Sequence, residues 1–337
     1  MTTTAPSTSG AVANAAHRAE VLVEALPYIQ RFRGAVVVVK YGGNAMVDPG
    51  LSQAVAEDVV LLRAVGLRPV VVHGGGPQIS ALMSRLGMEP EFRQGLRVTD
   101  AETVDIVRMV LVGKVNRDIV AAINVHGPIA VGLSGEDAGL ILASAHKPEL
   151  GFVGEVAAVN PGILHKLLAE DLIPVVSTIG SDADGQAYNI NADTVAGALA
   201  EALGAEKAVF LTDVAGLLTD VDDPGSLISR ITASELETMI GRGELTGGMI
   251  PKTAAALHAV RHGVGSAHLL DGREPHVVLL ELFSDAGIGT MITDDTPAPT
   301  PVGDLPATAG SPGSAGGGTG VGAVGRDTDR IRPGGQP

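Results

Sequence analysis

A lysine followed by two glycines closes the first strongly apolar segment of the chain. Val36–Val39 is a run of four valines, and it is followed by Lys40, Tyr41, Gly42 and Gly43. A run without polar alternation is typical of a strand covered on both faces in a parallel sheet. Glycines after such a strand let backbone N–H groups approach an anion, and Lys40 adds a positive charge there. The segment predicts a phosphate site, although lysines and Gly-Gly turns also end ordinary strands.

The same order of apolar strand, glycine turn and helix recurs further along the chain. Pro69–Val72 is a second apolar run, and it leads into His73–Pro77, which contains three consecutive glycines. We expect a helix to begin at Pro77, because proline is favoured as the first helical residue. Two such turns after neighbouring parallel strands would form an anion cradle. Neither turn has the glycine spacing of a dinucleotide fingerprint or the Gly-Lys-Ser/Thr of a Walker sequence.

Two further polar segments could face that cradle. Asn189, Asn191 and Asp193 alternate along a segment that precedes a predicted helix, so they could share one side or simply cap the helix. Lys252 falls in the first turn of another helix, after the loop Gly247–Pro251. Helix N-termini favour negative charge, so an anionic ligand explains this lysine better than stability does.

Arg97 and the loop after a later strand complete the candidate residues. Thr99 and Glu102 have the spacing of a capping box ahead of a long apolar helix, which leaves Arg97 on the preceding loop. Leu211–Gly216 is expected to leave a strand at the carboxyl edge, where open α/β sheets bind ligands.

The elements that must position these residues alternate between strand and helix. We therefore expect an α/β fold, a three-layer αβα sandwich around a largely parallel, doubly wound sheet. Further strands are predicted at 129–133, 173–177 and 208–211, a hairpin at 151–160, and helices at 51–65, 162–170, 192–203, 233–240 and 251–262.

Composition excludes several classes of protein. The 23 basic against 38 acidic residues give a net charge of −15, which argues against binding nucleic acid or an anionic membrane. The absence of cysteine excludes disulfides and fits a reducing compartment, and no export signal is recognised, so we expect a cytoplasmic protein. The nine histidines show no zinc-enzyme spacing such as His-Glu-x-x-His, so no metal site is expected.

The two ends of the chain differ from the centre. Residues 1–12 and 297–337 are small and polar or rich in Pro and Gly, and we expect both to be disordered. Residues 13–34 are expected to form a helix, kinked before Pro27, whose apolar face packs on another subunit.

These segments together resemble the amino acid kinase family, and within it the group that acts on N-acetyl-L-glutamate. The resemblance runs from about Ala15 to Thr293, and the Arg97 and Asn189–Asp193 segments are particular to that group. It is carried by Lys40–Met46, His73–Gly76, Phe92–Thr99, Asn189–Asp193 and Gly247–Lys252.

The resemblance implies transfer of the γ-phosphoryl group of ATP, with Mg²⁺, to the side-chain carboxylate of N-acetyl-L-glutamate, the second step of arginine synthesis. It makes Lys40, Lys252 and Asp193 catalytic, with Asp193 holding both lysines. Residues 35–296 would be the kinase domain, with acetylglutamate binding and dimerisation in 35–180 and ATP binding in 181–296. The implied substrate residues are Gly75, Gly76, Arg97, Asn189 and Asn191, and the implied ATP residues are Gly42, Gly43, Asp213, Val214, Leu218 and Thr246.

The resemblance also implies regulation. The N-terminal arm is similar to the extra helix of arginine-inhibited members, which assemble as homohexamers, trimers of dimers. Lys207, His268, Glu281 and Gly287 match their arginine-binding region, although Glu281 could also be a charge ending a strand at 277–280. The alternatives are a carbamate or aspartate kinase of the same family, or a non-catalytic arginine sensor on its fold.

Overall fold

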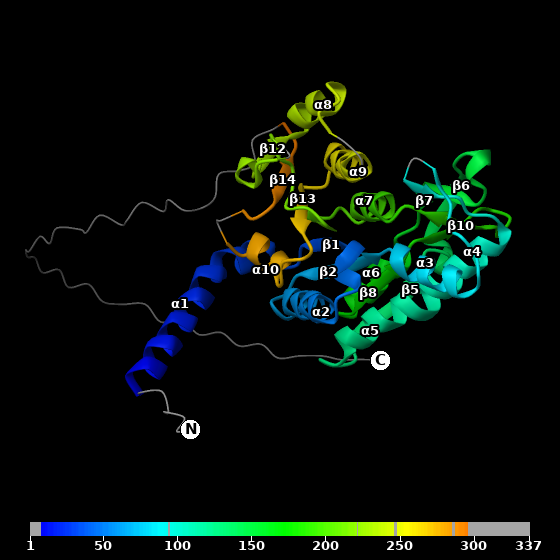
Figure 1. Ribbon diagram of the computed structural model, residues 1–337. Helices are drawn as coiled ribbons and strands as arrows, with labels where there is room; N and C mark the ends of the chain where they lie inside the picture. Colours follow the sequence, from blue (N-terminus) through cyan, green and yellow to red (C-terminus); the bar gives the residue numbers. More distant parts are fainter. Residues whose placement is uncertain (1–7, 94, 221, 246–247, 285–286, 296–337) are drawn as a thin grey trace, which may run out of the picture. The chain divides into compact units, whose positions relative to one another are not determined.

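An eight-stranded sheet lies at the centre of the computed structural model (Figure 1). All of its neighbouring strands are parallel except β13 and β14, which pair antiparallel. In spatial order the strands are β12 (Arg230–Thr232), β14 (Thr290–Thr293), β13 (Ser266–Asp271), β11 (Lys207–Thr212), β1 (Val36–Tyr41), β2 (Arg68–His73), β8 (Ile173–Ser177) and β5 (Ala130–Ser134).

The valine run in β1 shows why the sheet is covered on both faces. Val37 and Val39 belong to one core cluster and Val38 to a second, because successive side chains of a strand point to opposite faces. The first cluster includes residues of α2 (Pro49–Ala64) and α5 (Asn116–Asn124), and the second includes residues of α7 (Ala192–Ala202) and α9 (Met249–Arg261). The predicted three-layer fold is confirmed.

The remaining helices complete the layers and the connections. The predicted helices near 51–65, 162–170, 192–203, 233–240 and 251–262 are all present, with ends shifted by at most two residues. Two of these are α6 (Gly162–Ala169) and α8 (Ala233–Gly241). Further α-helices are α3 (Gly76–Arg85), α4 (Ala101–Arg108) and α10 (Val277–Leu282), and 3₁₀ turns lie at Gly43–Met46, Asp137–Gly139, Pro148–Leu150 and Pro224–Ser226.

A small closed barrel stands beside the sheet, formed by β6 (Ile141–Ala145), β7 (Val153–Val159), β9 (Ile179–Ser181) and β10 (Ala187–Ile190). The hairpin predicted at 151–160 is therefore wrong: β7 is one strand, paired with β6 and β10. A separate two-stranded ribbon consists of β3 (Phe92–Arg93) and β4 (Leu96–Arg97).

The long helix after Arg97 contains an irregular middle turn. Between α4 and α5 the residues Met109–Val115 form a π-helix, a rare form that is often found at functional sites. The side chain of Asp100, not Thr99, caps α4 by accepting a hydrogen bond from the N–H of Thr103. The predicted capping box fails because Thr99 is buried and its hydroxyl donates to the carbonyl of Arg97.

The N-terminal helix α1 spans Thr8–Phe32, so it begins before the expected Ala13. It is continuous through Pro27, and the kink itself stays a prediction.

The segment at 277–280 is not a strand but belongs to helix α10. A contact with α2 anchors the start of α10, because Nδ1 of His276 lies 2.6 Å from Oδ1 of the buried Asp58. Burial raises the pKa of Asp58 to about 6.

The structure describes residues 8–93, 95–220, 222–245, 248–284 and 287–295. The disorder predicted for residues 1–12 is wrong for residues 8–12, which belong to α1, and for residues 1–7 it lies outside these ranges. The disorder predicted for 297–337 also lies outside them. Within them, no helix is both long and apolar enough to cross a membrane.

Removing the largest apolar side chain of β11 should destabilise the sheet strongly. Phe210 is fully buried, and we expect Phe210→Ala to lower the free energy of unfolding by about 3–5 kcal/mol, since it leaves a cavity. Urea denaturation followed by circular dichroism measures the change. The control Val125→Ala removes a side chain that is 82% exposed and should stay within about 0.5 kcal/mol of the original. Equal effects of the two substitutions would contradict the core assignment.

Candidate active site

The candidate residues gather where the chain reverses its direction across the sheet. From β1 the chain passes to β2 on one side, and β11 lies on the other side of β1. In an open α/β sheet, ligands bind outside the carboxyl ends of the strands at such a switch point. Lys40 is the next-to-last residue of β1, Gly74–Gly76 follow β2, and Asp213 follows β11. The structure thus brings three of the predicted segments to one edge.

An ion pair joins this edge to helix α7. The ammonium of Lys40 lies 3.0 Å from Oδ1 of Asp193, and both side chains are less than 10% exposed. Asp193 stands in the first turn of α7, where a carboxylate is favoured by the helix dipole. The side chain of Asn191 accepts from the N–H groups of Asp193 and Thr194, so Asn191 is a helix cap. Its predicted role toward a substrate is not tested.

At the first glycine turn, Gly42 and Gly43, a Cβ atom would lie close to a charged side chain. A Cβ at Gly42 would lie 3.0 Å from the Nζ of Lys40. Gly43 has a φ of +70°, and a Cβ there would lie 2.7 Å from Oδ1 of Asp213. The turn after β1 and the loop after β11 are therefore in direct contact, and a side chain at either glycine would displace a charged group of the site.

The second glycine turn starts helix α3. Gly75 is the N-cap and Gly76 the first helical residue, so Pro77 is the second residue and not the first as expected. A Cβ at Gly75 would lie 2.6 Å from Cδ2 of Leu111 in the π-helix, whereas one at Gly76 would meet nothing within 4 Å. The π-helix thus packs directly against the loop whose N–H groups begin α3.

A buried histidine, His73, contacts the same loop, and the sequence assigned it no role of its own. His73 is fully buried, and burial lowers its pKa to about 4, so the ring is neutral at pH 7. Its Nδ1–H donates to the carbonyl of Gly74 (2.8 Å), and its Nε2 accepts from the amide of Asn116 (3.0 Å). That amide also donates to the carbonyl of Val175, and Arg117 donates to the Asn116 side-chain oxygen. A polar Asn116 on the apolar face of its helix was the available signal.

Arg97 is the second buried cation of the region. Its Nη2 donates to the carbonyl of Gly76 (3.1 Å) and to the hydroxyl of Ser80 (2.8 Å), and its guanidinium lies 4.7 Å from the ring centroid of Phe92. Burial lowers its pKa from the ordinary value. Within the described part of the chain no carboxylate lies at ion-pair distance from Arg97.

Asn189 lies beside Arg97. Its amide donates weakly to the hydroxyl of Thr99 (3.4 Å), and that hydroxyl donates to the carbonyl of Arg97 (2.8 Å). Asn189 comes from β10 of the small barrel and Arg97 from the β3–β4 ribbon, so two separate elements converge here. Thr99 thus links the side chain of Asn189 to the backbone of Arg97, and both Asn189 and Arg97 are predicted substrate residues.

The second predicted catalytic lysine has no contact with Asp193. The Nζ of Lys252 donates to the carbonyl of Gly248 (3.3 Å) in the first turn of α9. Among the described residues, Asp193 forms its ion pair with Lys40 alone, so a bridge from Asp193 to both lysines stays a prediction.

Of the predicted nucleotide residues, Val214 is 40% exposed on the loop after β11, and Leu218 pairs with Leu227. Thr246 lies outside the described residues.

A second cluster of buried titratable side chains consists of Lys207, His268 and Glu281. It lies at the end of α1, where Lys207 contacts Phe32. The Nζ of Lys207 lies 3.1 Å from Nε2 of His268, and Nδ1 of His268 lies 2.8 Å from Oε1 of Glu281. Burial lowers the pKa of Lys207 to about 8 and that of His268 to about 4. Burial also opposes ionisation of Glu281, but the hydrogen bond from His268 holds its pKa below the ordinary value. The N–H of Ile288, next to Gly287, donates to the same carboxylate (3.1 Å).

Comparison with known proteins decides the family. A model described as the amino acid kinase family matches residues 35–271. The chain belongs to the amino acid kinase family. The matched residues contain both glycine turns, Lys40, Asp193 and Lys252.

Several members of the amino acid kinase family are close in sequence. The acetylglutamate kinase of Saccharopolyspora erythraea is 57% identical over 291 residues, which is 84% of this chain and 95% of that protein. The acetylglutamate kinase of Acidothermus cellulolyticus is 56% identical, over 82% of this chain and 96% of that protein.

Solved structures share the fold. N-acetylglutamate synthase from Neisseria gonorrhoeae, complexed with coenzyme A and N-acetyl-glutamate, matches with a TM-score of 0.73 and 25% identity, over 82% of this chain and 63% of that one. Carbamate kinase from Giardia lamblia bound to AMP-PNP matches with a TM-score of 0.59 and 19% identity, over 78% of this chain and 99% of that one. The latter likeness concerns the fold alone.

The two neighbouring glycines of the α3 turn should respond oppositely to a methyl group. We expect Gly75→Ala to lower the free energy of unfolding by about 1–3 kcal/mol, because its Cβ would overlap Leu111. Gly76→Ala is the matched control and should be neutral or slightly stabilising, because its Cβ would lie in open space at a helix start. Thermal and urea unfolding of both variants test the difference, and equal losses would show that the π-helix does not constrain this turn.

Proposed function

We propose that the chain transfers the γ-phosphoryl group of ATP to the side-chain carboxylate of N-acetyl-L-glutamate, giving N-acetyl-L-glutamyl 5-phosphate in arginine synthesis. The observation that carries the proposal is a pair of buried cations near the Gly74–Gly76 turn. Arg97 donates to the carbonyl of Gly76, and Lys40 precedes Tyr41, whose carbonyl accepts from the N–H of Gly74. Relatives 54–57% identical over most of the chain are acetylglutamate kinases, which supports the acceptor.

The chemistry requires positioning and charge more than proton transfer. A glutamate-like carboxylate has a pKa near 4.3 and is ionised at neutral pH, so the nucleophile needs no general base. The difficulty is to bring two anions together and to stabilise charge on the transferring phosphoryl group. This matches the absence, among the described residues of the sheet edge, of a histidine poised to accept a proton: His73 is buried and its two nitrogens are both hydrogen-bonded.

Lys40 is the residue that meets the phosphoryl group in this proposal. Asp193 fixes its ammonium at the end of β1, which makes the charge preorganised before the substrates arrive. The N–H groups at Gly43 and at the start of α3 are the candidate donors to phosphate oxygens. Lys252 would approach from α9. Its ammonium donates to the carbonyl of Gly248, at the start of the same helix.

The residues present fit a magnesium ion carried by the nucleotide. Among the described residues, the group of three metal-ligating side chains consists of Glu201, His258 and His262, which are not at this sheet edge. The described part of the edge therefore has no carboxylate cage. Mg²⁺ commonly keeps its waters and binds substrate phosphates, whose negative charge it neutralises. We therefore propose ATP with Mg²⁺ as the phosphoryl donor, with residues 181–296 binding ATP and 35–180 binding acetylglutamate and forming the dimer. A chain without cysteine suits the reducing cytoplasm, where we place the activity.

Arg97 should select the acceptor. We expect Arg97→Lys to raise the KM for N-acetyl-L-glutamate roughly 10- to 100-fold, because a planar guanidinium binds a carboxylate through two hydrogen bonds and an ammonium does not. The KM for ATP should stay unchanged. Steady-state kinetics with a coupled ADP-release assay measure both constants. Arg93→Lys is the matched control, because Arg93 lies on the same ribbon and its side chain is 51% exposed.

The same assay separates the alternatives. Full activity with aspartate or carbamate in place of N-acetyl-L-glutamate would identify another kinase of the family. Absence of ADP release with every acceptor would identify a non-catalytic arginine sensor. Loss of ATP affinity in Arg97→Lys would place that residue at the nucleotide and overturn its assigned role.

We also propose that arginine inhibits the enzyme and that the chain forms a homohexamer through α1. The supporting observation is the buried series Lys207, His268 and Glu281, which ends beside Phe32 of α1: the Nζ of Lys207 lies 4.8 Å from that ring centroid. The ammonium of Lys207 and the carboxylate of Glu281, at the two ends of this series, are complementary to the oppositely charged groups of an amino acid. Exposed apolar residues on α1, Val21, Leu22, Val23 and Leu26, offer a surface for another subunit.

Glu281 should control arginine inhibition without affecting turnover. We expect Glu281→Gln to weaken inhibition by roughly 10- to 100-fold in arginine concentration, because a charge-assisted hydrogen bond is lost, with uninhibited kcat unchanged. Dose-response curves for arginine measure the effect. Glu274→Gln, an exposed position before α10, is the control.

The oligomeric part of the proposal has its own test. Deleting residues 1–30, which spares the buried Phe32, should give active dimers that arginine inhibits poorly. Light scattering reports the assembly, and hexamers after this deletion would contradict the role of α1.

A further inference from the structure

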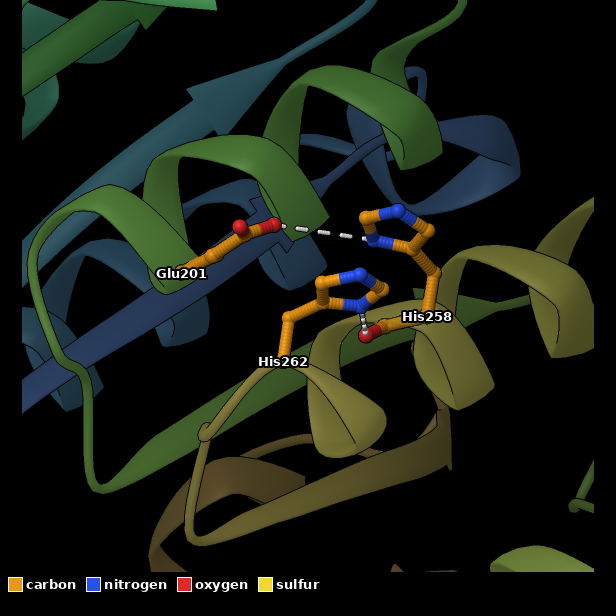
Figure 2. A group of neighbouring side chains, drawn as sticks. All are labelled: Glu201, His258 and His262. Atoms are coloured by element: carbon orange, nitrogen blue, oxygen red, sulfur yellow. Dashed lines mark hydrogen bonds and ion pairs between the residues drawn. The ribbon is translucent and has the colours of Figure 1, made fainter.

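Two histidines and a glutamate meet on the surface between α7 and α9 (Figure 2). Glu201 comes from the last turn of α7, His258 from the last turns of α9, and His262 is the residue that ends α9. One ligand atom from each of the three lies within 4.8 Å of the others. The group is remote from the kinase chemistry above, and the proposal below does not depend on that function.

The spacing of the histidines on one helix aligns them. Residues four apart stand on the same helix face, and the rings of His258 and His262 stack with centroids 3.9 Å apart and planes 14° from parallel. The sequence alone does not reveal this group, because the third residue, Glu201, lies on another helix. Oε2 of Glu201 lies 3.7 Å from Nδ1 of His258 and supplies that third ligand.

A hydrogen bond prepares one ring for metal binding. The Nδ1 of His262 lies 2.7 Å from the carbonyl oxygen of His258, so Nδ1 carries the proton and donates it to that carbonyl. The lone pair of the neutral ring is then on Nε2, which Figure 2 shows on the side away from this bond. Histidine ligands in metal sites are typically fixed in this way by a hydrogen bond from their other nitrogen.

The site is open to solvent and to further ligands. Glu201 and His258 line a groove of ≈ 550 Å³ between α7, α9 and β7. Their side chains are 38% and 58% exposed, so small rotations can draw the three ligand atoms to the roughly 3.4 Å separation that bonds of about 2.1 Å require. Three protein ligands leave at least one coordination position for water.

We propose that Glu201, His258 and His262 bind a divalent transition-metal ion of the zinc type, which links α7 to α9. Two imidazole nitrogens and one carboxylate suit Zn²⁺, Ni²⁺ and Cu²⁺, and they disfavour Mg²⁺, which prefers oxygen ligands. Asp193 and Lys252 lie in the first turns of these two helices, so the ion joins the opposite, C-terminal ends.

Zinc titration tests the site directly. Tag-free, EDTA-treated full chain without nucleotide should bind Zn²⁺ at this site by isothermal titration calorimetry, and Mg²⁺ should not compete. At a hundredfold excess over its dissociation constant, Zn²⁺ should raise the melting temperature by roughly 5 °C. His258→Ala and His262→Ala should each weaken this binding by about tenfold or more and abolish most of the shift, and Glu201→Gln should weaken it as well.

A matched variant controls for exposed histidines in general. The double substitution His126→Ala/His165→Ala also removes two exposed rings and should leave zinc affinity and the shift in melting temperature unchanged. Zinc affinity that is unchanged in His258→Ala/His262→Ala, equal displacement by Mg²⁺, or no zinc binding to the unmodified chain would each overturn the proposal. All variants lie on the surface, and their melting temperatures without metal confirm that they fold.

Discussion

The ion pair between Lys40 and Asp193 is the constraint on which the rest of the site depends. It connects the central strand β1 to the first turn of α7, and both partners are withdrawn from water. Removing one partner of such a pair typically costs about 3–5 kcal/mol, whereas replacing both with apolar residues is often neutral. Stability alone therefore gives little reason to keep the pair. A ligand that needs a fixed positive charge at the carboxyl edge gives a better one.

Among the residues that the structure describes, buried basic side chains lie at three places. Lys40, Arg97 and Lys207 are each at most 8% exposed, although a basic side chain is rarely buried without a function or a partner. Lys40 has a carboxylate and Lys207 reaches one through His268, while Arg97 has only neutral acceptors in the described chain. In the proposed function these positions correspond to phosphoryl group, acceptor and effector. The chain carries a net charge of −15, so these basic side chains are local exceptions to its overall field.

Sequence reasoning succeeded where the signal was local. The valine run, the glycine turns and the helices follow from neighbouring residues, and β1, β2, α2 and α7 lie where they were expected. It failed where distant segments decide the outcome. The barrel closes through pairs of strands that are far apart in the chain, β7 with β10 and β6 with β9. The hydroxyl of the buried Thr99 donates to the carbonyl of Arg97 instead of capping α4. The contact of His73 with Asn116 spans 43 residues, so no local pattern announces it.

The β3–β4 ribbon has a consequence for how acceptors can change in evolution. It pairs with neither the central sheet nor the barrel in the described structure, yet it delivers Arg97 to the Gly74–Gly76 turn. Lys40, by contrast, is held in a strand with neighbours on both sides. Substitutions in the ribbon can therefore accumulate without disturbing the sheet on which phosphate handling depends. In the proposed function, specificity and catalysis thus lie on separable pieces of backbone, so a family with one phosphoryl-transfer scaffold can diversify its substrates by remodelling a few residues.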